Sequence, residues 1–238
     1  MGFRHGFLRK GGQGSRVVRK PIRITALLLG VLICLGMSAF VAYRASQQVP
    51  DFYEQALKAA PEIEKAASDA MIQRAMTLAS EVREPGSWEA VFTTEQINGW
   101  LAVDLPRNYP DSLPPNVRDP RVAIKPRQLR VACRYQGDHW STVLSLAADV
   151  YLAAPNVIAV RIHGARAGRL PLPLQKILEQ IAQETARLDL HVRWTQAAGD
   201  PVAEISIAPR PDSDGKTIRV ESLELGDGEL YLAGTTEP

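Results

Sequence analysis

An uncharged apolar segment near the N-terminus constrains the fold of this chain most. Residues 24–43 contain no charged side chain, and their apolar character is interrupted only by Thr25, Gly30, Gly36 and Ser38. These 20 residues match the roughly 20 that an α-helix needs to cross the hydrocarbon core of a bilayer, about 30 Å thick. The sequence therefore predicts one transmembrane helix over residues 24–43.

Basic residues gather on the N-terminal side of this segment. Seven of them lie in residues 1–23, whereas Arg44 is the one basic residue directly after the segment. By the positive-inside rule, this asymmetry predicts that residues 1–23 stay in the cytoplasm and that the chain after the segment lies outside. The basic head has no apolar period and is expected to be disordered. We therefore expect a single-pass, signal-anchored protein of the cytoplasmic membrane with an extracytoplasmic domain.

Two other N-terminal signals fit the sequence less well. A cleaved signal peptide has a shorter apolar core followed by small residues at the cleavage site, and residues 41–45 (VAYRA) match such a site poorly. A bacterial lipoprotein needs a small residue before its lipidated cysteine, but Ile33 precedes Cys34. An uncleaved anchor without a lipid is therefore the prediction.

The chain beyond the anchor has the composition of a folded, mildly acidic domain. The whole sequence is 45% hydrophobic and 23% charged, as globular proteins are. After residue 44, 26 acidic residues outnumber 20 basic ones, so neither nucleic acid nor bulk attraction to anionic lipid headgroups is expected. Cys34 and Cys133 lie in different environments and cannot pair, so the core must suffice without disulfides. Cys133 is interpreted as a small buried hydrophobe, with a reactive thiol as the alternative.

Helical patterns occupy the first part of the predicted domain. A polar linker, residues 44–50, precedes a helical segment over residues 51–84. Pro61 is expected to divide this segment, because proline is accepted at a helix start but not inside a helix. We favour the segment as the first helix of the domain over a stalk. The α+β extracytoplasmic domain is predicted over residues 85–238.

A further helix is marked by Thr93 and Gln96, which have capping-box spacing. Trp100 and Leu101 are expected to point inward on this helix, which is predicted to stop before Pro106. The segment 105–120 contains five prolines and is expected to form a loop.

The period of the apolar residues changes to two near residue 129. Strands are predicted over residues 129–135, 144–152, 158–162, 190–194, 202–207 and 218–225, with a last one near residues 230–232. Tight turns make neighbouring strands antiparallel, and one-sided alternation leaves one sheet face covered and the other in water. The predicted fold class is α+β: a curved, mainly antiparallel sheet packed on one or two amphipathic helices.

The clearest amphipathic helix begins after residues 168–173 and has apolar residues at helical spacing. Two interpretations of the apolar faces stay open. One is an ordinary packed core, and the other is a groove between sheet and helix that holds an acyl chain or another apolar guest, with residues 105–120 as a lid. The candidate groove residues are Trp100, Leu101, Leu174, Ile177, Leu178, Ile181 and Trp194.

No catalytic or metal-binding motif is recognisable in the sequence. It has no Cys-x-x-Cys, Gly-x-Ser-x-Gly elbow, phosphate loop or dinucleotide fingerprint. His163 and His191 occupy outward positions of separate predicted strands and could meet, although solvated histidines are the simpler interpretation. Asp149 is a mid-strand acid on the outward face. The sequence therefore predicts no enzyme, no cofactor and no metal site.

Two stretches resemble the YpmS-like family of bacterial membrane-anchored proteins, namely residues 92–98 (FTTEQIN) and residues 168–173 (GRLPLP). The similarity covers residues 88–208, and the basic head and single anchor are similar in layout, whereas residues 51–84 have no counterpart. The resemblance implies a fold like that of tubular lipid-binding proteins, in which a curled sheet wraps a helix and cradles lipid. The family has no assigned catalytic residues, so none is carried over.

The anchor, the apolar faces and the resemblance lead to one functional hypothesis. We expect a non-catalytic, membrane-anchored domain outside the cytoplasm that binds a lipid or another apolar ligand. The alternative is a structural or assembly protein that docks a protein partner of the cell envelope. An envelope hydrolase ranks third.

Overall fold

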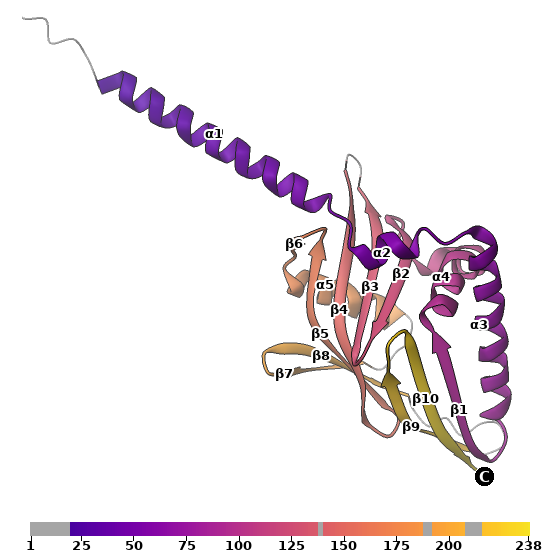
Figure 1. Cartoon of the computed structure of the whole chain (residues 1–238). Coiled ribbons are helices and arrows are strands. Elements are labelled where there is room, and N and C mark those ends of the chain that lie inside the picture. Colours follow the sequence, from indigo (N-terminus) through magenta and orange to yellow (C-terminus); the bar gives the residue numbers. More distant parts are fainter. Residues whose placement is uncertain (1–19, 138–139, 188–191, 208–215) are drawn as a thin grey trace, which may run out of the picture. The chain divides into compact units, whose positions relative to one another are not determined.

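The computed structural model describes residues 20–137, 140–187, 192–207 and 216–238. The chain divides into two compact units, residues 1–42 and residues 43–238, and each is described by itself. Figure 1 labels the helices and strands.

The first helix, α1, spans Lys20–Ser46 and contains the predicted anchor, residues 24–43. Most of the predicted cytoplasmic head, residues 1–23, lies outside the described residues, and the side chains of the helix are described from Leu32 onward. Within the part of the chain that the structure describes, no helix is long and apolar enough to cross a membrane. The anchor stays a prediction.

Two helices follow the linker and belong to the second unit. α2 spans Asp51–Ala56 and α3 spans Pro61–Glu81. Pro61 occupies the first turn of α3, as predicted, where its missing N–H removes no helical hydrogen bond. α2 contacts β2 (Val117–Lys125), and α3 packs on α4 (Thr94–Asn108). Both helices are therefore packed into the domain.

Thr93 caps α4, as the sequence predicts. The Thr93 hydroxyl accepts a hydrogen bond from the backbone N–H of Gln96 at 3.2 Å, and the side-chain oxygen of Gln96 accepts one from the Thr93 N–H at 3.0 Å. The prediction that this helix stops before Pro106 is wrong, because α4 continues to Asn108. Pro106 lies in the last turn, where the loss of one N–H donor disturbs only the end of the helix.

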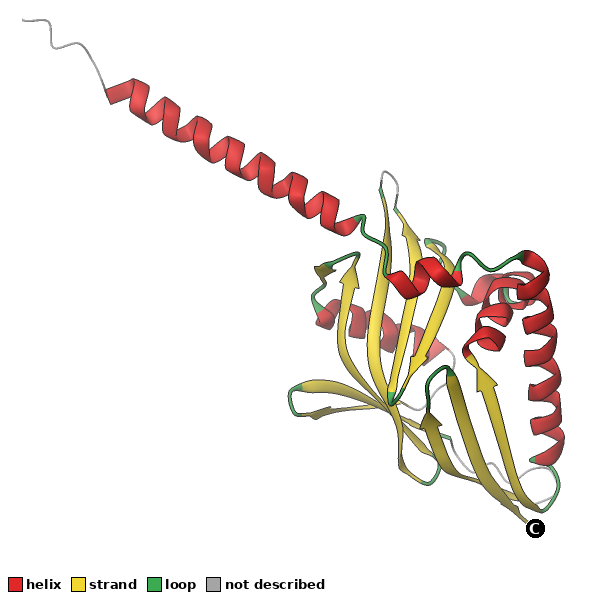
Figure 2. Ribbon diagram, viewed as in Figure 1, coloured by secondary structure: helices red, strands yellow, loops and turns green. Residues whose placement is uncertain are grey.

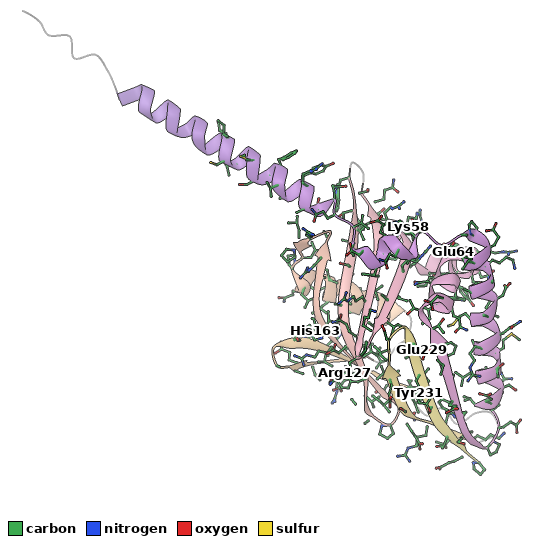
Figure 3. The ribbon with its side chains drawn as sticks, in the orientation of Figure 1. Lys58, Glu64, Arg127, His163, Glu229 and Tyr231 are labelled. Atoms are coloured by element: carbon green, nitrogen blue, oxygen red, sulfur yellow. The ribbon has the colours of Figure 1, made fainter. Side chains whose placement is uncertain are left out.

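α3 and α4 cross in close contact at Gly99. A Cβ atom on Gly99 would lie 2.6 Å from the backbone nitrogen of Ser68 and 2.7 Å from the backbone oxygen of Glu64. The fully buried Ser68 donates a short hydrogen bond to the carboxylate of Asp104 across the same contact. Glu64, labelled in Figure 3, pairs with the buried Arg121 at 2.9 Å. Polar contacts and close packing therefore hold the helix pair together.

A small antiparallel sheet has the strand order β1-β10-β9. Its strands are β1 at Gly86–Thr93, β10 at Glu229–Glu237 and β9 at Thr217–Leu225. Trp88 lies opposite Gly234, and its ring fills the space that a side chain at Gly234 would need. α3 and α4 contact β1, so these helices cover the small sheet.

The larger sheet has the strand order β2-β3-β4-β5-β8-β7, and all its neighbouring strands are antiparallel (Figure 2). The predicted α+β class with antiparallel sheets and few helices is therefore confirmed. The strand bounds not given above are Gln128–Gln136 for β3, Ser141–Ala154 for β4, Val157–Ala167 for β5, Leu170–Pro171 for β6, which pairs with β5, Val192–Ala197 for β7 and Asp200–Ser206 for β8.

The prediction of one loop over residues 105–120 is wrong. The end of α4, a short 3-10 helix at Pro110–Ser112 and the start of β2 occupy much of this range. The pairing of β2 with β3 shifts in register between Arg118 and Arg121. Pro120 is tolerated there because β2 is an edge strand, where a missing N–H need not break the ladder. The segment is built into the sheet edge and does not form a separate lid.

Two asparagine side chains join separate elements. Asn98 on α4 donates to the backbone oxygen of Val122 at 2.9 Å and accepts from its N–H at 2.8 Å, which pairs part of the outer edge of β2. Asn156 in the β4–β5 turn donates to the backbone oxygen of Ile218 at 3.0 Å and accepts from the N–H of Val220 at 2.6 Å. The amide of Asn156 therefore connects the larger sheet to β9 of the small one.

Tyr53 holds α2 against the larger sheet. Its side chain is 1% exposed and packs with Ala132 and Val143. Its hydroxyl donates to the backbone oxygen of Asp119 at 2.9 Å. Burial raises the pKa of Tyr53 to about 12, so the phenol stays a hydrogen-bond donor at all physiological pH values. Figure 1 shows α2 lying over β2–β4 on this side of the sheet.

We expect Gly99→Ala to destabilise the domain. The added methyl group meets backbone atoms of α3, which cannot move alone, and such overpacking costs about 1–3 kcal/mol. The higher helix propensity of alanine offsets up to about 1 kcal/mol of this cost. Chemical denaturation of the full chain measures the change in the free energy of unfolding. Gly226→Ala is the control, since a Cβ atom there would meet its nearest neighbour at 3.8 Å; equal stability of both variants would contradict the close crossing.

Candidate functional site

The register of the larger sheet gives it two chemically different faces. Trp194 lies opposite Ala203, Ala203 opposite Val160, and Val160 opposite Val150, so these side chains share one face across four strands. We call this side the apolar face. Its large aliphatic and aromatic residues on β3, β4, β5, β7 and β8 include Leu129, Val131, Leu144, Leu146, Val150, Leu152, Ile158, Val160, Trp194 and Ile205.

A β-bulge in β5 maintains this separation of faces. Ile162 pairs with Ala148 while Gly164 pairs with Ala147, which leaves His163 as an additional residue in β5. Before the bulge, the even-numbered residues of β5 point to the apolar face. After the bulge, the odd-numbered alanines do so, and the arginine between them joins the opposite, polar face.

Most large side chains of the apolar face are only partly buried. All ten residues named above are half-buried, whereas Ile162, Ala148, Ala165 and Ala203 on the same face are buried. Apolar area that stays accessible can still be buried by a further contact, which would contribute roughly 25 cal/mol per Å². The face therefore retains apolar surface for a further contact.

The predicted amphipathic helix is α5, at Leu174–Arg187. It contacts β5, and Figure 1 shows it on the side of the larger sheet away from α2. Leu174, Ile177 and Leu178 are half-buried. The side chain of Ile181 lies outside the described residues. The structure thus brings three of the predicted groove residues next to the sheet that carries Trp194.

Trp100 and Leu101 lie elsewhere. They belong to α4, which packs on α3, β1 and β2, at the sheet edge opposite to β7. The Trp100 ring contacts Tyr109, with ring centroids 6.0 Å apart. The seven predicted groove residues therefore do not form one site. Helical spacing located the inward side of α4 without revealing which sheet edge it covers.

A cluster of ionic groups lies on the polar face around His163. Its Nε2 is 2.9 Å from a carboxylate oxygen of Asp149, and its Nδ1 is 3.1 Å from one of Asp200. Arg161 pairs with the same Asp200 at 2.8 Å. Figure 3 shows His163 near the β7–β8 hairpin. His191, the predicted neighbour of His163, lies outside the described residues, so that contact stays a prediction.

The two carboxylates set the charge of His163. The hydrogen bond to Asp149 has the largest effect and raises its pKa; burial opposes this with the next largest effect, and the hydrogen bond to Asp200 raises the pKa further, so that it lies above the ordinary value. Arg161 first, and His163 second, lower the pKa of Asp200. The two carboxylates therefore favour the protonated form of His163. The outward strand positions of Asp149 and His163 were the signals of this cluster in the sequence, although their contact was not predicted.

The part of the chain that the structure describes also includes possible metal ligands and the thiol of Cys133. No group of three or more histidine, cysteine or acidic side chains there has the arrangement of a metal site. Cys133 lies half-buried on the apolar face, and burial raises the pKa of its thiol. A raised pKa disfavours the nucleophilic thiolate, which agrees with the interpretation of Cys133 as a small hydrophobe.

We expect the pKa of His163 to exceed the ordinary value of about 6.5 and to fall in Asp149→Asn. A group whose pKa is raised by folding stabilises the folded state fully below its unfolded-state pKa, and this contribution is lost as pH rises through the folded-state pKa. NMR titration of the imidazole in the full chain measures the pKa. Asp227→Asn, which removes the exposed partner of Lys125, is the control and leaves the His163 titration unchanged. An unshifted titration in Asp149→Asn would refute the assigned contact.

Comparisons with protein-family models, with curated proteins and with solved structures found no match to this chain. The resemblance of residues 92–98 and 168–173 to the YpmS-like family is therefore still a prediction, and the functional argument rests on the geometry.

Proposed function

We propose that this chain is a membrane-anchored extracytoplasmic protein whose domain binds the acyl part of a lipid, or another apolar ligand, without catalysing a reaction. The observation that carries the proposal is the apolar face of the larger sheet. It extends over β3, β4, β5, β8 and β7, and most of its large side chains are half-buried.

An acyl chain fits the chemistry of this face. The ten large residues that define the face are aliphatic apart from Trp194, and none of them has a charge that a ligand would need to neutralise. Contiguous apolar surface of this kind is rare on a protein without a binding role. A flexible hydrocarbon chain can follow a row of such side chains and gains about 0.8 kcal/mol for each buried methylene group.

The predicted anchor supports a lipid as the ligand. A helix over residues 24–43 would keep the domain next to a bilayer, where acyl chains are abundant. The resemblance to the YpmS-like family, and through it to tubular lipid-binding folds, points in the same direction. Proximity to lipid follows from the anchor and not from the net charge of the domain, which is acidic.

Photo-crosslinking in intact bacterial membranes tests the proposal without detergent. Leucine is replaced during expression of the full chain by its diazirine analogue, and labelled peptides are identified by mass spectrometry after illumination. We expect lipid adducts on Leu144, Leu146 and Leu152 of the apolar face. We also expect them on leucines within residues 24–43, which tests the anchor separately. The buried Leu225 of β9 is the internal control and gives no lipid adduct.

A pair of adjacent substitutions provides the matched control. Val150→Gln introduces a polar group on the apolar face, and Tyr151→Gln makes a similar change on the exposed side of the same strand. An unpartnered amide against an acyl chain costs about 1–3 kcal/mol, so Val150→Gln is expected to reduce the lipid adduct on Leu152 about tenfold. Tyr151→Gln leaves it unchanged.

Two results would decide against lipid binding. If the apolar-face leucines gave no adduct while the anchor leucines did, the face would be an ordinary core surface. If they gave adducts with one defined envelope protein, the domain would be a docking module, which is the alternative function expected from the sequence.

A further inference from the structure

A pocket whose chemistry differs from that of the apolar face lies on the polar face of the larger sheet. Its volume is about 660 Å³. Residues 48–52, which are the end of the linker and the first two residues of α2, form one wall, and β3, β4 and β5 form the floor. We call it the basic pocket, because three arginines line it: Arg130, Arg166 and Arg169.

Small residues keep the floor of the basic pocket open. In the register, Arg130 on β3 is followed across the sheet by Ala147 on β4 and Gly164 on β5. The next row in the same direction has Ser145 on β4 and Arg166 on β5. A Cβ atom on Gly164 would meet no atom within 4 Å. Two arginines therefore flank a floor whose side chains are too short to fill the space between them.

The arginines of the basic pocket lack the acidic partners that other arginines have. Elsewhere on this sheet, Arg161 and Arg193 pair with carboxylates at 2.8 and 2.6 Å. For Arg166 and Arg169, no carboxylate partner occurs among the described residues. The Nε of Arg130 donates to the neutral side-chain oxygen of Gln128 at 2.7 Å, which orients its guanidinium group without neutralising it.

The other ionic groups of the basic pocket do not cancel this charge. Asp51 is the one acidic residue among those that line the pocket. His163 also lines it, but Asp149 and Asp200 hold both its ring nitrogens. Three guanidinium groups against one carboxylate leave the pocket electropositive, although the domain as a whole is acidic.

Backbone contacts fix the rim of the basic pocket. Gly168, with a φ of 57°, donates its N–H to the backbone oxygen of Val143 at 2.8 Å. The N–H of Arg169 bonds the backbone oxygen of Ala45 at 2.9 Å, and the Thr142 hydroxyl donates to that of Ser46 at 2.6 Å. The chain that enters the domain is thus fastened beside Arg169, and the pocket exists before any ligand binds.

We propose that the basic pocket binds a phosphate-class anion, a phosphomonoester or phosphodiester group. A guanidinium group presents paired N–H donors that match phosphate oxygens in a bidentate manner, and it stays charged at every physiological pH. Three of them around an open floor suit a tetrahedral anion better than a planar carboxylate, which two donors would satisfy. The pocket volume accommodates a glycerophosphate headgroup as well as inorganic phosphate.

A phosphate group that fits the basic pocket can come from two sources, a free phosphate and a lipid headgroup. If residues 24–43 span the bilayer, Gln48 on the pocket wall is five residues beyond the anchor and within about 18 Å of its end along the chain. The headgroup source therefore rests on the proposed function, whereas anion binding itself does not. The basic pocket and the apolar face lie on opposite sides of one sheet, so they are separate sites.

Calorimetric titration of the full chain in uncharged detergent micelles tests the proposal with three probes: inorganic phosphate, dihexanoyl phosphatidylglycerol and, for comparison, the zwitterionic dihexanoyl phosphatidylcholine. We expect saturable binding of inorganic phosphate or of the phosphatidylglycerol. Arg166→Gln and Arg130→Gln each weaken it about tenfold or more, because each removes charge-assisted hydrogen bonds. Tighter binding of the phosphatidylglycerol than of inorganic phosphate assigns the headgroup source, and the reverse order assigns the free anion.

Two further variants distinguish a specific anion site from nonspecific attraction of the anion to positive surface charge. Arg118→Gln makes the same charge change at an exposed position of β2 outside the pocket and leaves the affinity unchanged. Gly164→Leu fills the floor without altering charge and weakens binding about as much as Arg166→Gln does. Thermal unfolding without ligand confirms that the variants are folded.

The proposal is overturned if the wild-type chain binds neither anion, or if Arg118→Gln weakens binding as much as Arg166→Gln. Its failure is distinct from that of the proposed function. If the apolar-face leucines give no lipid adduct while phosphate binding is intact and depends on the arginines, only the proposal of an acyl ligand is refuted. If the adducts form but neither anion binds, only the proposal of an anion site is refuted.

Discussion

The alternation of side chains along β3, β4 and β5, interrupted in β5 by one bulge, is the constraint on which the rest of the domain depends. A strand places successive residues on opposite faces, so each of these strands presents an apolar side and a polar side. α5 lies by the first side, while α2 and the entering linker lie on the second. Tyr53 can seal α2 onto the polar side because the residues beneath it, Ala132 and Val143, are small or aliphatic. The arginines of the basic pocket lie on the same side of the sheet, beyond the residues that Tyr53 covers.

Much of the fold follows from the sequence, because local rules and tertiary packing agree. Period-two patterns located most strands of the larger sheet, and the Thr93–Gln96 spacing located the start of α4. The predictions were wrong where a proline was taken to end a helix or to exclude a strand. Pro106 is harmless in a last helical turn, and Pro120 is harmless at a register shift in an edge strand, so α4 was expected to end too early and β2 was expected to be loop. Only the pairing partner of β2 reveals that it is a strand.

The candidate sites show where sequence reasoning stops. The inward side of α5 could be predicted, because the spacing of apolar residues within one helix is enough to identify its apolar side. Trp100 was grouped with it wrongly, because the spacing within α4 says nothing about which sheet edge α4 covers. The basic pocket was missed for a similar reason: Arg130 and Arg166 are 36 positions apart and meet only through the pairing of β3, β4 and β5. Net charge averaged over the acidic domain conceals them.

The bulge at His163 and Gly164 has a consequence for how this chain tolerates insertion and deletion. His163 is the one residue by which β5 exceeds β4 at that point. Removing it would restore regular pairing, and Gly164, Ala165 and Arg166 would keep their partners on β4 and therefore their faces. Removing a residue after the bulge, such as Ala165, would instead turn Arg166 toward the apolar side. β5 can therefore lose a residue at the bulge without mixing its two faces, but not in the regular strand that follows.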